Sequence, residues 1–255
     1  MSRTFQRGET VLLSEGERSY LVRLVEKMGR IRGTRGAVSL EKIVGLKEGD
    51  TMSIGTKEFR LFRPDICDIL EGIERGPQLI TTKDSARLVQ MLSLRSGSKV
   101  VEGGAGSGAL TIMILNSVWS EGSVTTYELR NDHLNLARRN INLSGMNSIW
   151  EGKTGDIREG IPESDMDAFV VDIPDPEACV DTALNSLRIG GRFAGYVPTI
   201  NQMERLSLAL EETGFSGVRA EEILLRGYNL KKGAMRPSTE MVGHTGFLIY
   251  ARRTE

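Results

Sequence analysis

A glycine-rich turn carries the clearest chemical signal in the sequence. An apolar stretch ends at Glu102, and glycines follow at positions 104, 106 and 108, where a helical pattern begins. Because glycine has no side chain, a ligand can lie against the bare backbone and against the N–H groups of that helix. The spacing therefore predicts a nucleotide-type site after a strand. The residues expected to contact this ligand are Glu102, Gly104, Gly106, Ser107, Gly108 and Ala109.

Two carboxylates help to identify the ligand. Glu128 ends the next predicted strand, 20 residues after Gly108, where its side chain can accept hydrogen bonds from both hydroxyls of a ribose. Glu102 at the strand tip would repel a pyrophosphate but would attract the cationic sulfonium and ammonium groups of S-adenosylmethionine. The sequence therefore favours S-adenosylmethionine as the cofactor.

A dinucleotide remains an alternative ligand for the same turn. The pattern Gly104-x-Gly106-x-x-Ala109 also satisfies the dinucleotide-binding motif, so an NAD-dependent oxidoreductase has to be considered. Such an enzyme needs an acid for hydride transfer, for example a Tyr/Lys or His pair near the sheet. We find no convincing pair of this kind in the sequence.

Asp156 and Ile157 follow a predicted third strand. The Asp156 carboxylate can accept a hydrogen bond from the exocyclic amine of an adenine, and on this basis we assign both residues to the cofactor site. An aspartate after a strand is as commonly the N-cap of a helix, so the two roles stay open.

The reaction site is predicted at the loop Asp172-Ile173-Pro174-Asp175-Pro176, directly after an apolar strand. In an open α/β sheet, ligands lie outside the carboxyl ends of the strands, so Asp172 should face the reactive end of the cofactor. Two prolines restrict φ on either side of Asp175 and stiffen the loop, which can then hold a carboxylate against a planar substrate. The alternative is a simple turn that ends the strand.

Alternating strand and helix patterns are expected to position these residues. Repeated strand-then-helix units with short connections predict a parallel sheet with helices on both faces, and apolar pieces at 223–225 and 247–250 predict a closing antiparallel hairpin. Asp84 or Ser85 is the expected N-cap of the first helix, and Thr199 that of the last. Strands are predicted at 99–101, 124–127, 168–171 and 193–197, and helices at 84–94, 108–118, 132–143, 177–187 and 200–212.

The first 70 residues have a different pattern. Short β-like pieces separated by turn signals predict a small β domain over residues 1–70, and residues 71–255 then form the α/β domain. The predicted pieces lie at 10–13, 20–22, 36–38 and 58–62.

Composition excludes several classes of protein. With 39% hydrophobic and 26% charged residues in 255, and no stretch close to the ~20 apolar residues of a membrane span, the chain fits a soluble globular protein. Cys67 and Cys179 form no Cys/His cluster, so neither a disulfide framework nor a metal site is expected, and the absence of a secretory pattern predicts a cytoplasmic location.

The net charge of -1 argues against a non-specific nucleic-acid binder, although local basic patches remain. Two such patches are candidates for RNA contact. They are Arg23, Lys27, Arg30, Arg32 and Arg35, and Arg226, Lys231, Lys232 and Arg236.

Taken together, the motifs resemble those of the tRNA adenine-N1 methyltransferases, which modify the T-loop. Their joint order is more specific than any one of them, and the small departures are Gly103, Ala105 and the pair Thr81-Thr82. The similar segments are 75–84, the glycine turn at 102–111, the strand end at 127–130, the acidic proline loop at 172–176, and the segments 196–202 and 244–248.

The resemblance implies a class I S-adenosylmethionine-dependent methyltransferase, Rossmann-like, that methylates N1 of adenosine 58 in tRNA, and in some archaeal members also adenosine 57. N1 carries a free lone pair, so no base is needed, and Asp172 would orient the ring through its N6 amine. Tyr196 would stack on the base. Gln78 and Thr81 would close over the cofactor, and His133 would lie near its adenine. Members of the family form homotetramers.

Two alternatives within the same fold stay open. A class I methyltransferase with another acceptor fits the cofactor half equally well. A non-catalytic RNA-binding subunit of a tRNA methyltransferase complex should have lost the glycines or the acidic loop, and this chain has both.

Overall fold

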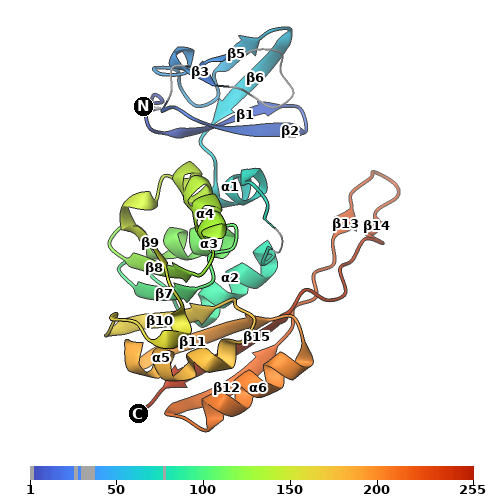
Figure 1. The fold of residues 1–255 in the computed structure, drawn as a ribbon. Helices are drawn as coiled ribbons and strands as arrows, with labels where there is room; N and C mark the ends of the chain where they lie inside the picture. Colours follow the sequence, from blue (N-terminus) through green and yellow to red (C-terminus); the bar gives the residue numbers. More distant parts are fainter. Residues whose placement is uncertain (1–2, 26–27, 30–37, 77–78) are drawn as a thin grey trace.

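The computed structural model describes residues 3–25, 28–29, 38–76 and 79–255. At the N-terminal end, four antiparallel strands form a sheet in the order β2-β1-β6-β5 (Figure 1). Its strands are β1 (Thr10–Glu15), β2 (Arg18–Arg23), β5 (Thr51–Ile54) and β6 (Lys57–Phe62). Two-residue strands β3 (Met28–Gly29) and β4 (Val38–Ser39) pair beside it, and the short helix η1 (Leu40–Lys42) follows.

Alternation along β6 explains how this small sheet builds a core. Phe59 and Leu61 are buried, whereas Glu58 and Arg60, which alternate with them, are exposed, as expected when successive side chains point to opposite faces. The buried pair packs with Phe5, Leu13 and Ile43 in a cluster separate from those of the larger sheet. Strand β5 is not among the predicted strands, and residues 36–37 of the predicted piece 36–38 lie outside the described residues.

The larger sheet has seven strands in the order β12-β15-β11-β10-β7-β8-β9. The five strands from β11 to β9 are parallel, while β15 is antiparallel to both β11 and β12. The chain runs outward from β7 to β9 and then returns to the other side of β7 as β10, which creates a switch point at which ligands bind. The strands are β7 (Lys99–Gly103), β8 (Ser123–Glu128), β9 (Trp150–Thr154), β10 (Met166–Val171), β11 (Leu187–Val197), β12 (Phe215–Glu221) and β15 (Phe247–Arg253).

Helices cover both faces of this sheet (Figure 1). In β10, Ala168 and Val170 join one hydrophobic cluster, and Phe169 and Val171 join the other, which is why its apolar run does not alternate with polar residues. The first cluster packs under α1 (Ile66–Gly72), α2 (Thr82–Met91), α3 (Ala109–Val118) and α4 (Asn131–Ser144), and the second under η4 (Pro176–Cys179), α5 (Val180–Ser186) and α6 (Ile200–Glu211). Short helices η2 (Asn147–Ile149) and η3 (Ile157–Glu159) flank β9.

The predicted fold class is confirmed, with differences at two elements. Helix α2 begins at Thr82 with Thr81 as its N-cap, so the prediction of Asp84 or Ser85 as the cap is wrong, because both are buried inside its first turn. Thr199 is the N-cap of α6 as predicted, since its hydroxyl accepts from the Gln202 N–H.

The predicted strand at 223–225 is also wrong. Strand β12 ends at Glu221, and Leu224 and Leu225 are exposed instead of packing in a core. Residues 222–246 leave the sheet as an arm that carries β13 (Tyr228–Asn229) and β14 (Arg236–Pro237) and projects from the body of the protein (Figure 1). Among the described helices, none has both the length and the apolar character needed to cross a bilayer.

Asn140 of α4 ties the segment before α2 to the glycine turn. Its side chain is fully buried, and its Oδ1 accepts from the Glu74 N–H at 2.9 Å. Its Nδ2 donates to the carbonyls of Glu74 at 2.9 Å and Ser107 at 2.7 Å. One amide therefore satisfies three backbone groups that lie 33 and 66 residues away in sequence.

We expect Asn140→Ala to lower the free energy of unfolding by about 3 kcal/mol, because three hydrogen bonds worth about 1 kcal/mol each are lost and their backbone partners stay unpaired. Urea unfolding measures the change. The matched control is Asn142→Ala, an exposed asparagine on the same helix, which should change the free energy by less than about 0.5 kcal/mol. Equal effects of the two substitutions would contradict the assigned role.

Candidate functional site

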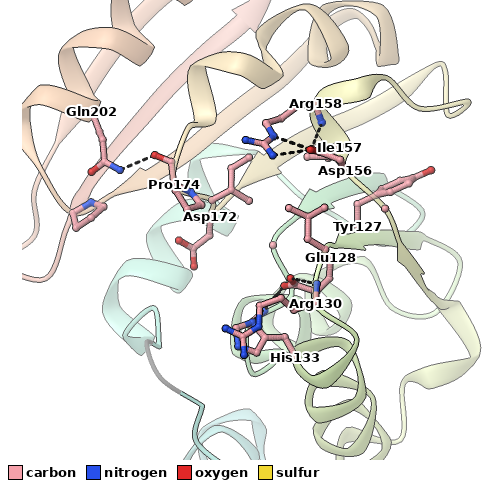
Figure 2. A pocket seen from close by; sticks show the side chains of 16 residues that line it. Tyr127, Glu128, Arg130, His133, Asp156, Ile157, Arg158, Asp172, Pro174 and Gln202 are labelled. Carbon is pink, nitrogen blue, oxygen red and sulfur yellow. Dashed lines mark hydrogen bonds and ion pairs between the residues drawn. The ribbon is translucent and has the colours of Figure 1, made fainter.

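A pocket of about 580 Å³ opens at the carboxyl ends of β7, β8 and β10, at the switch point of the sheet. Figure 2 shows its lining side chains, which come from loops far apart in the sequence. Parallel strands bring these loops together because their carboxyl ends share one edge of the sheet. The predicted site residues in the lining are Gly104, Gly106, Glu128, His133, Asp156, Ile157 and Asp172.

The glycine turn is shaped by two close approaches. Gly104 has φ +91°, and a Cβ there would lie 2.2 Å from the Asp172 carbonyl oxygen, so only glycine allows the ends of β7 and β10 to meet. A Cβ on Gly108 would press on Ala137 of α4, with 3.2 Å to its Cα. At Gly106 a Cβ would meet nothing within 4 Å, because this position faces the pocket. The open space beside Gly106 is where a ligand can lie.

The remaining residues of the turn lie behind it. Ser107, Gly108 and Ala109 are buried and are not among the described lining residues. Their contact with the ligand stays a prediction, and the structure places Ser107 against Asn140 and Ala109 in the first turn of α3. These residues shape the turn that Gly104 and Gly106 present to the pocket.

Glu128 is fixed under the turn by backbone donors. Its Oε2 accepts from the N–H groups of Ala105 at 3.0 Å and Gly106 at 3.4 Å, and its Oε1 accepts from the Arg130 N–H at 2.9 Å. The Nδ1 atom of His133 lies 3.9 Å from Oε2. These contacts hold the carboxylate at the pocket wall before any ligand binds, which lowers the cost of ordering it.

Glu102 lies beneath the pocket instead of lining it. Its side chain is fully buried, and Oε2 accepts from the hydroxyls of Thr111 and Thr126, both at 2.7 Å. The Oε1 atom has no hydrogen-bond partner within the described part of the chain. Burial raises the pKa of Glu102 to about 7, with the charges of Asp172 and Glu128 acting in the same direction and the two threonine bonds opposing them. Glu102 was predicted to contact the cofactor directly, and the structure places its side chain behind the pocket lining.

Asp172 projects into the pocket from the end of β10 (Figure 2). Its backbone N–H donates to the Gly103 carbonyl at 2.8 Å. Asp172 is exposed to solvent through the pocket opening, but nearby protein atoms desolvate its carboxyl group. This desolvation, together with the charge of Glu128, raises the pKa of Asp172 to about 7. Three carboxyl groups near one cavity favour a cationic ligand over a pyrophosphate, which supports S-adenosylmethionine against a dinucleotide.

The acidic proline loop is held at the edge of the pocket by Gln202, to which no role was assigned from sequence. Gln202 of α6 donates from Nε2 to the Pro174 carbonyl at 2.8 Å and accepts from the Thr199 hydroxyl at 2.6 Å. Gln202 and Pro198 both line the pocket. In the sequence, only the position of Pro198 and Gln202 directly after the strand that contains Tyr196 indicates that they lie near the pocket.

Asp156 is an N-cap, one of the two roles that the sequence left open, and its place in the pocket lining keeps the cofactor role as a prediction. It is the N-cap of η3, with its Oδ1 accepting from the Arg158 N–H at 3.0 Å, and it also lines the pocket beside Ile157. The Arg158 guanidinium holds the pKa of Asp156 below its ordinary value. The carboxylate therefore stays ionised and can accept hydrogen bonds.

Tyr196 does not stand in the pocket. Its side chain is only 3% exposed, its hydroxyl donates to the Thr245 carbonyl, and its ring packs so closely on Gly246 that a Cβ there would lie 2.4 Å away. Burial raises the pKa of Tyr196 to about 12. The prediction that Tyr196 stacks on a substrate base is therefore not met in this structure, because the ring is part of the core.

Thr81 turns toward a buried polar cluster that the sequence did not indicate. Its hydroxyl donates to the Asp84 Oδ2 at 2.7 Å, and Thr245 donates to the same atom at 2.7 Å. Lys83 Nζ lies 2.7 Å from the Asp84 Oδ1. This cluster joins α2 to the base of the arm. Gln78, the other residue expected to close over the cofactor, lies outside the described residues.

Comparisons with known proteins identify similar proteins that are methyltransferases, in agreement with a pocket suited to S-adenosylmethionine. A family described as "tRNA methyltransferase complex GCD14 subunit" matches residues 72–236. The chain is 33% identical, over 93% of its length and 92% of the relative, to the tRNA (adenine(57)-N(1)/adenine(58)-N(1))-methyltransferase TrmI of Methanocaldococcus jannaschii.

Two solved structures are similar over nearly the whole chain. One is a SAM-dependent O-methyltransferase from Thermotoga maritima, with a TM-score of 0.84, 31% identity, and coverage of 99% of this chain and 95% of that one. The other is the tRNA (m1A58) methyltransferase TrmI from Aquifex aeolicus, with a TM-score of 0.76, 27% identity, and coverage of 99% and 100%. Across residues 3–25, 28–29, 38–76 and 79–255, no group of three or more His, Cys, Asp or Glu residues could hold a metal ion.

The buried Glu102 should make stability fall as pH rises. Its pKa is raised from 4.5 to about 7 in the folded chain, so between these pH values the folded state binds more protons than the unfolded state. The free energy of unfolding therefore falls as the pH rises from 4.5, and the loss is complete above about pH 7. We expect the free energy of unfolding of Glu102→Gln, relative to the parent, to rise by up to about 3 kcal/mol between pH 5 and pH 8. Urea unfolding at both values measures it. Parallel pH profiles of the two proteins would refute the assignment.

Proposed function

Because the chain belongs to the family of tRNA methyltransferase complex GCD14 subunits, we propose that it transfers a methyl group from S-adenosylmethionine to N1 of an adenosine in tRNA. The proposed position is 58 in the T-loop, with 57 as a second position, by likeness to the relative from Methanocaldococcus jannaschii. The observation that carries the proposal is Asp172, which projects from β10 into the same pocket that the glycine turn borders. The proposed enzyme acts in the cytoplasm.

The residues of the pocket fit the cofactor. Space beside Gly106 admits a ligand against bare backbone, and Glu128 presents a fixed carboxylate suited to a ribose diol. Asp156 offers an acceptor for an adenine amine, and His133 lies next to Glu128. When bound, the cofactor supplies an electrophilic methyl group on a positively charged sulfur.

Asp172 is proposed to orient the acceptor base instead of removing a proton. N1 of adenine has a free lone pair, so its attack needs no base, and the product ring is a cation. An ionised Asp172 that accepts a hydrogen bond from the N6 amine holds the ring in place and stabilises the positive charge that develops on it. Because N1 is covered in folded tRNA, the base must turn out of the RNA into the pocket.

The arm at 222–246 supports the proposal of a homotetramer. It carries several large apolar side chains that are 61–78% exposed, and an exposed group of this kind is typical of an interface. These side chains are Leu224, Leu225, Tyr228, Leu230 and Met235.

Basic residues support the proposed contact with tRNA. Arg226, Lys231, Lys232 and Arg236 share the arm, and Arg23 ends β2 of the N-terminal sheet. Lys27, Arg30, Arg32 and Arg35 of the first patch lie outside the described residues. The separate core of the N-terminal sheet supports the division proposed from sequence into a β domain at 1–70 and a catalytic domain at 71–255.

A methyltransferase that acts on oxygen is the second candidate, because the similar structure from Thermotoga maritima is that of a SAM-dependent O-methyltransferase. Transfer to a hydroxyl requires a base, and Asp172 could serve as one. The two candidates separate when the protein is incubated with an unmodified tRNA transcript and methyl-labelled cofactor and the RNA is digested to nucleosides for mass spectrometry. Labelled 1-methyladenosine supports the proposal, whereas labelled cofactor that binds without any label entering RNA favours another acceptor.

We expect Asp172→Ala to slow methyl transfer to tRNA by roughly 10- to 150-fold, since a hydrogen bond to a charged group is worth about 1.5–3 kcal/mol. Cofactor affinity should remain, because Glu128 and the glycine turn are unchanged. Single-turnover kinetics measures the rate. Asp181→Ala, an exposed aspartate on α5, is the control. A rate equal to that of the control would remove Asp172 from the mechanism.

Gly106→Val should weaken binding of S-adenosylhomocysteine by roughly tenfold to a hundredfold, because its side chain fills the space that the ligand needs, at a cost of about 1–3 kcal/mol. Isothermal calorimetry measures the Kd. Gly217→Val is the matched control, because Gly217 also has positive φ and open space around it but lies in β12. Both variants carry the same backbone strain, so an unchanged Kd in Gly106→Val would refute the assignment of the turn.

A further inference from the structure

Arg158 lies between two loops that border the pocket (Figure 2). Its Nε is 2.8 Å from the Asp156 Oδ1, and its Nη2 is 2.6 Å from the Asp156 Oδ2. Its Nη1 is 3.5 Å from the Asp175 Oδ2. Asp156 follows β9 on the cofactor side, and Asp175 belongs to the loop that begins with Asp172. One guanidinium therefore contacts both loops.

Arginine suits this position better than any other side chain. Its planar fork matches both oxygens of one carboxylate and still leaves an N–H group for a second partner, which a lysine ammonium cannot reproduce in the same geometry. The bond to Asp156 raises the pKa of Arg158, so it remains charged. The contact with Asp175 is longer and more exposed, so it should be the weaker of the two.

On the cofactor side, Arg158 fixes the rotamer of Asp156. The carboxylate accepts from three N–H donors of Arg158. They are Nε, which is shared between Oδ1 at 2.8 Å and Oδ2 at 3.1 Å, Nη2 at 2.6 Å, and the backbone N–H at 3.0 Å. A carboxylate has about four acceptor positions, so one remains for an amine that approaches from the pocket. Without the guanidinium, the Asp156 side chain would keep only its N-cap bond and could turn away.

On the acceptor side, the loop after Asp172 has few backbone donors of its own. Pro174 and Pro176 carry no N–H, so side chains must hold the loop. Gln202 binds the Pro174 carbonyl from α6, and Arg158 reaches Asp175 from η3. These two contacts hold the loop at Pro174 and Asp175, while the backbone N–H of Asp172 is bonded to the Gly103 carbonyl.

We propose that Arg158 is a positioning residue that couples the adenine subsite of the cofactor to the loop that presents Asp172. Through Asp156 it sets the preference of the site for an adenine amine, and through Asp175 it sets the placement of the acceptor carboxylate. This inference rests on the proposed function, because it assigns Asp156 to the cofactor and Asp172 to the acceptor base.

The first experiment measures how strongly the protein prefers a ligand that carries the N6 amine of adenine. Calorimetry compares S-adenosylhomocysteine with its inosine analogue, in which an oxygen replaces the N6 amine and cannot donate. We expect the parent protein to prefer the adenosine compound by about tenfold or more. Arg158→Ala and Arg158→Lys should reduce this preference to about threefold or less, while Asp175→Asn keeps it. Undiminished preference in both arginine variants would overturn the proposal.

Controls separate this role from a structural one. Arg188→Ala removes a similar arginine–aspartate pair, with Asp167, that lies away from the pocket, and it should leave the preference unchanged. Thermal unfolding shows which variants are folded. If Arg158→Ala does not fold, the binding test is made with Arg158→Lys alone. Loss of the amine preference in Arg188→Ala would also contradict the specific role of Arg158.

The second experiment measures coupling to the acceptor loop. At saturating cofactor, Asp175→Asn should slow single-turnover methylation of tRNA by about threefold, in the range expected for an exposed ion pair, without a change in cofactor Kd. In the Arg158→Ala background, the same change should have no further effect. Additive effects would refute the coupling. If the parent protein does not methylate tRNA, the proposed function is wrong. The calorimetric experiment still tests whether Arg158 sets the preference for the adenine amine.

Discussion

The site depends on the way the carboxyl ends of four parallel strands are joined to one another by backbone hydrogen bonds. Gly104 donates to the Tyr127 carbonyl at 2.9 Å, Asp172 donates to the Gly103 carbonyl at 2.8 Å, and Gly155 donates to the Glu128 carbonyl at 3.1 Å. This network requires the left-handed backbone of Gly104, because any Cβ there would collide with Asp172. The arrangement of these strand ends around the pocket therefore requires a glycine at position 104.

Electrostatics make this framework selective. Glu102, Glu128 and Asp172 surround the same region, and the pKa values of Glu102 and Asp172 are both raised to about 7. Such an arrangement is unfavourable for the protein alone, since like charges and burial both oppose ionisation. A cation in the pocket relieves that repulsion, which is why perturbed carboxyl groups mark functional sites more often than structural ones.

Contacts outside the pocket connect it to the rest of the chain. The Asp84 cluster joins the start of α2 to Thr245 at the base of the arm, and the hydroxyl of Thr10 in β1 donates to the Leu143 carbonyl at the end of α4 at 2.7 Å. The arm and the N-terminal sheet are thus fastened to elements that also support the pocket. Surfaces proposed for assembly and for tRNA are in this way physically continuous with the site of methyl transfer.

The sequence by itself determined the features that depend on local spacing. Glycines at fixed intervals, strand-then-helix units and acidic residues at strand ends were enough to predict the sheet and to bring Gly106, Glu128, Asp156 and Asp172 to one edge, because parallel strands present their carboxyl ends together. Only the tertiary structure decided which side chains face the cavity. Tyr196 is buried against Gly246, Glu102 lies under the turn, and Arg158 pairs across two loops. The physical reason is that a rotamer and its partners are set by packing between segments distant in the chain, which spacing along one segment does not encode.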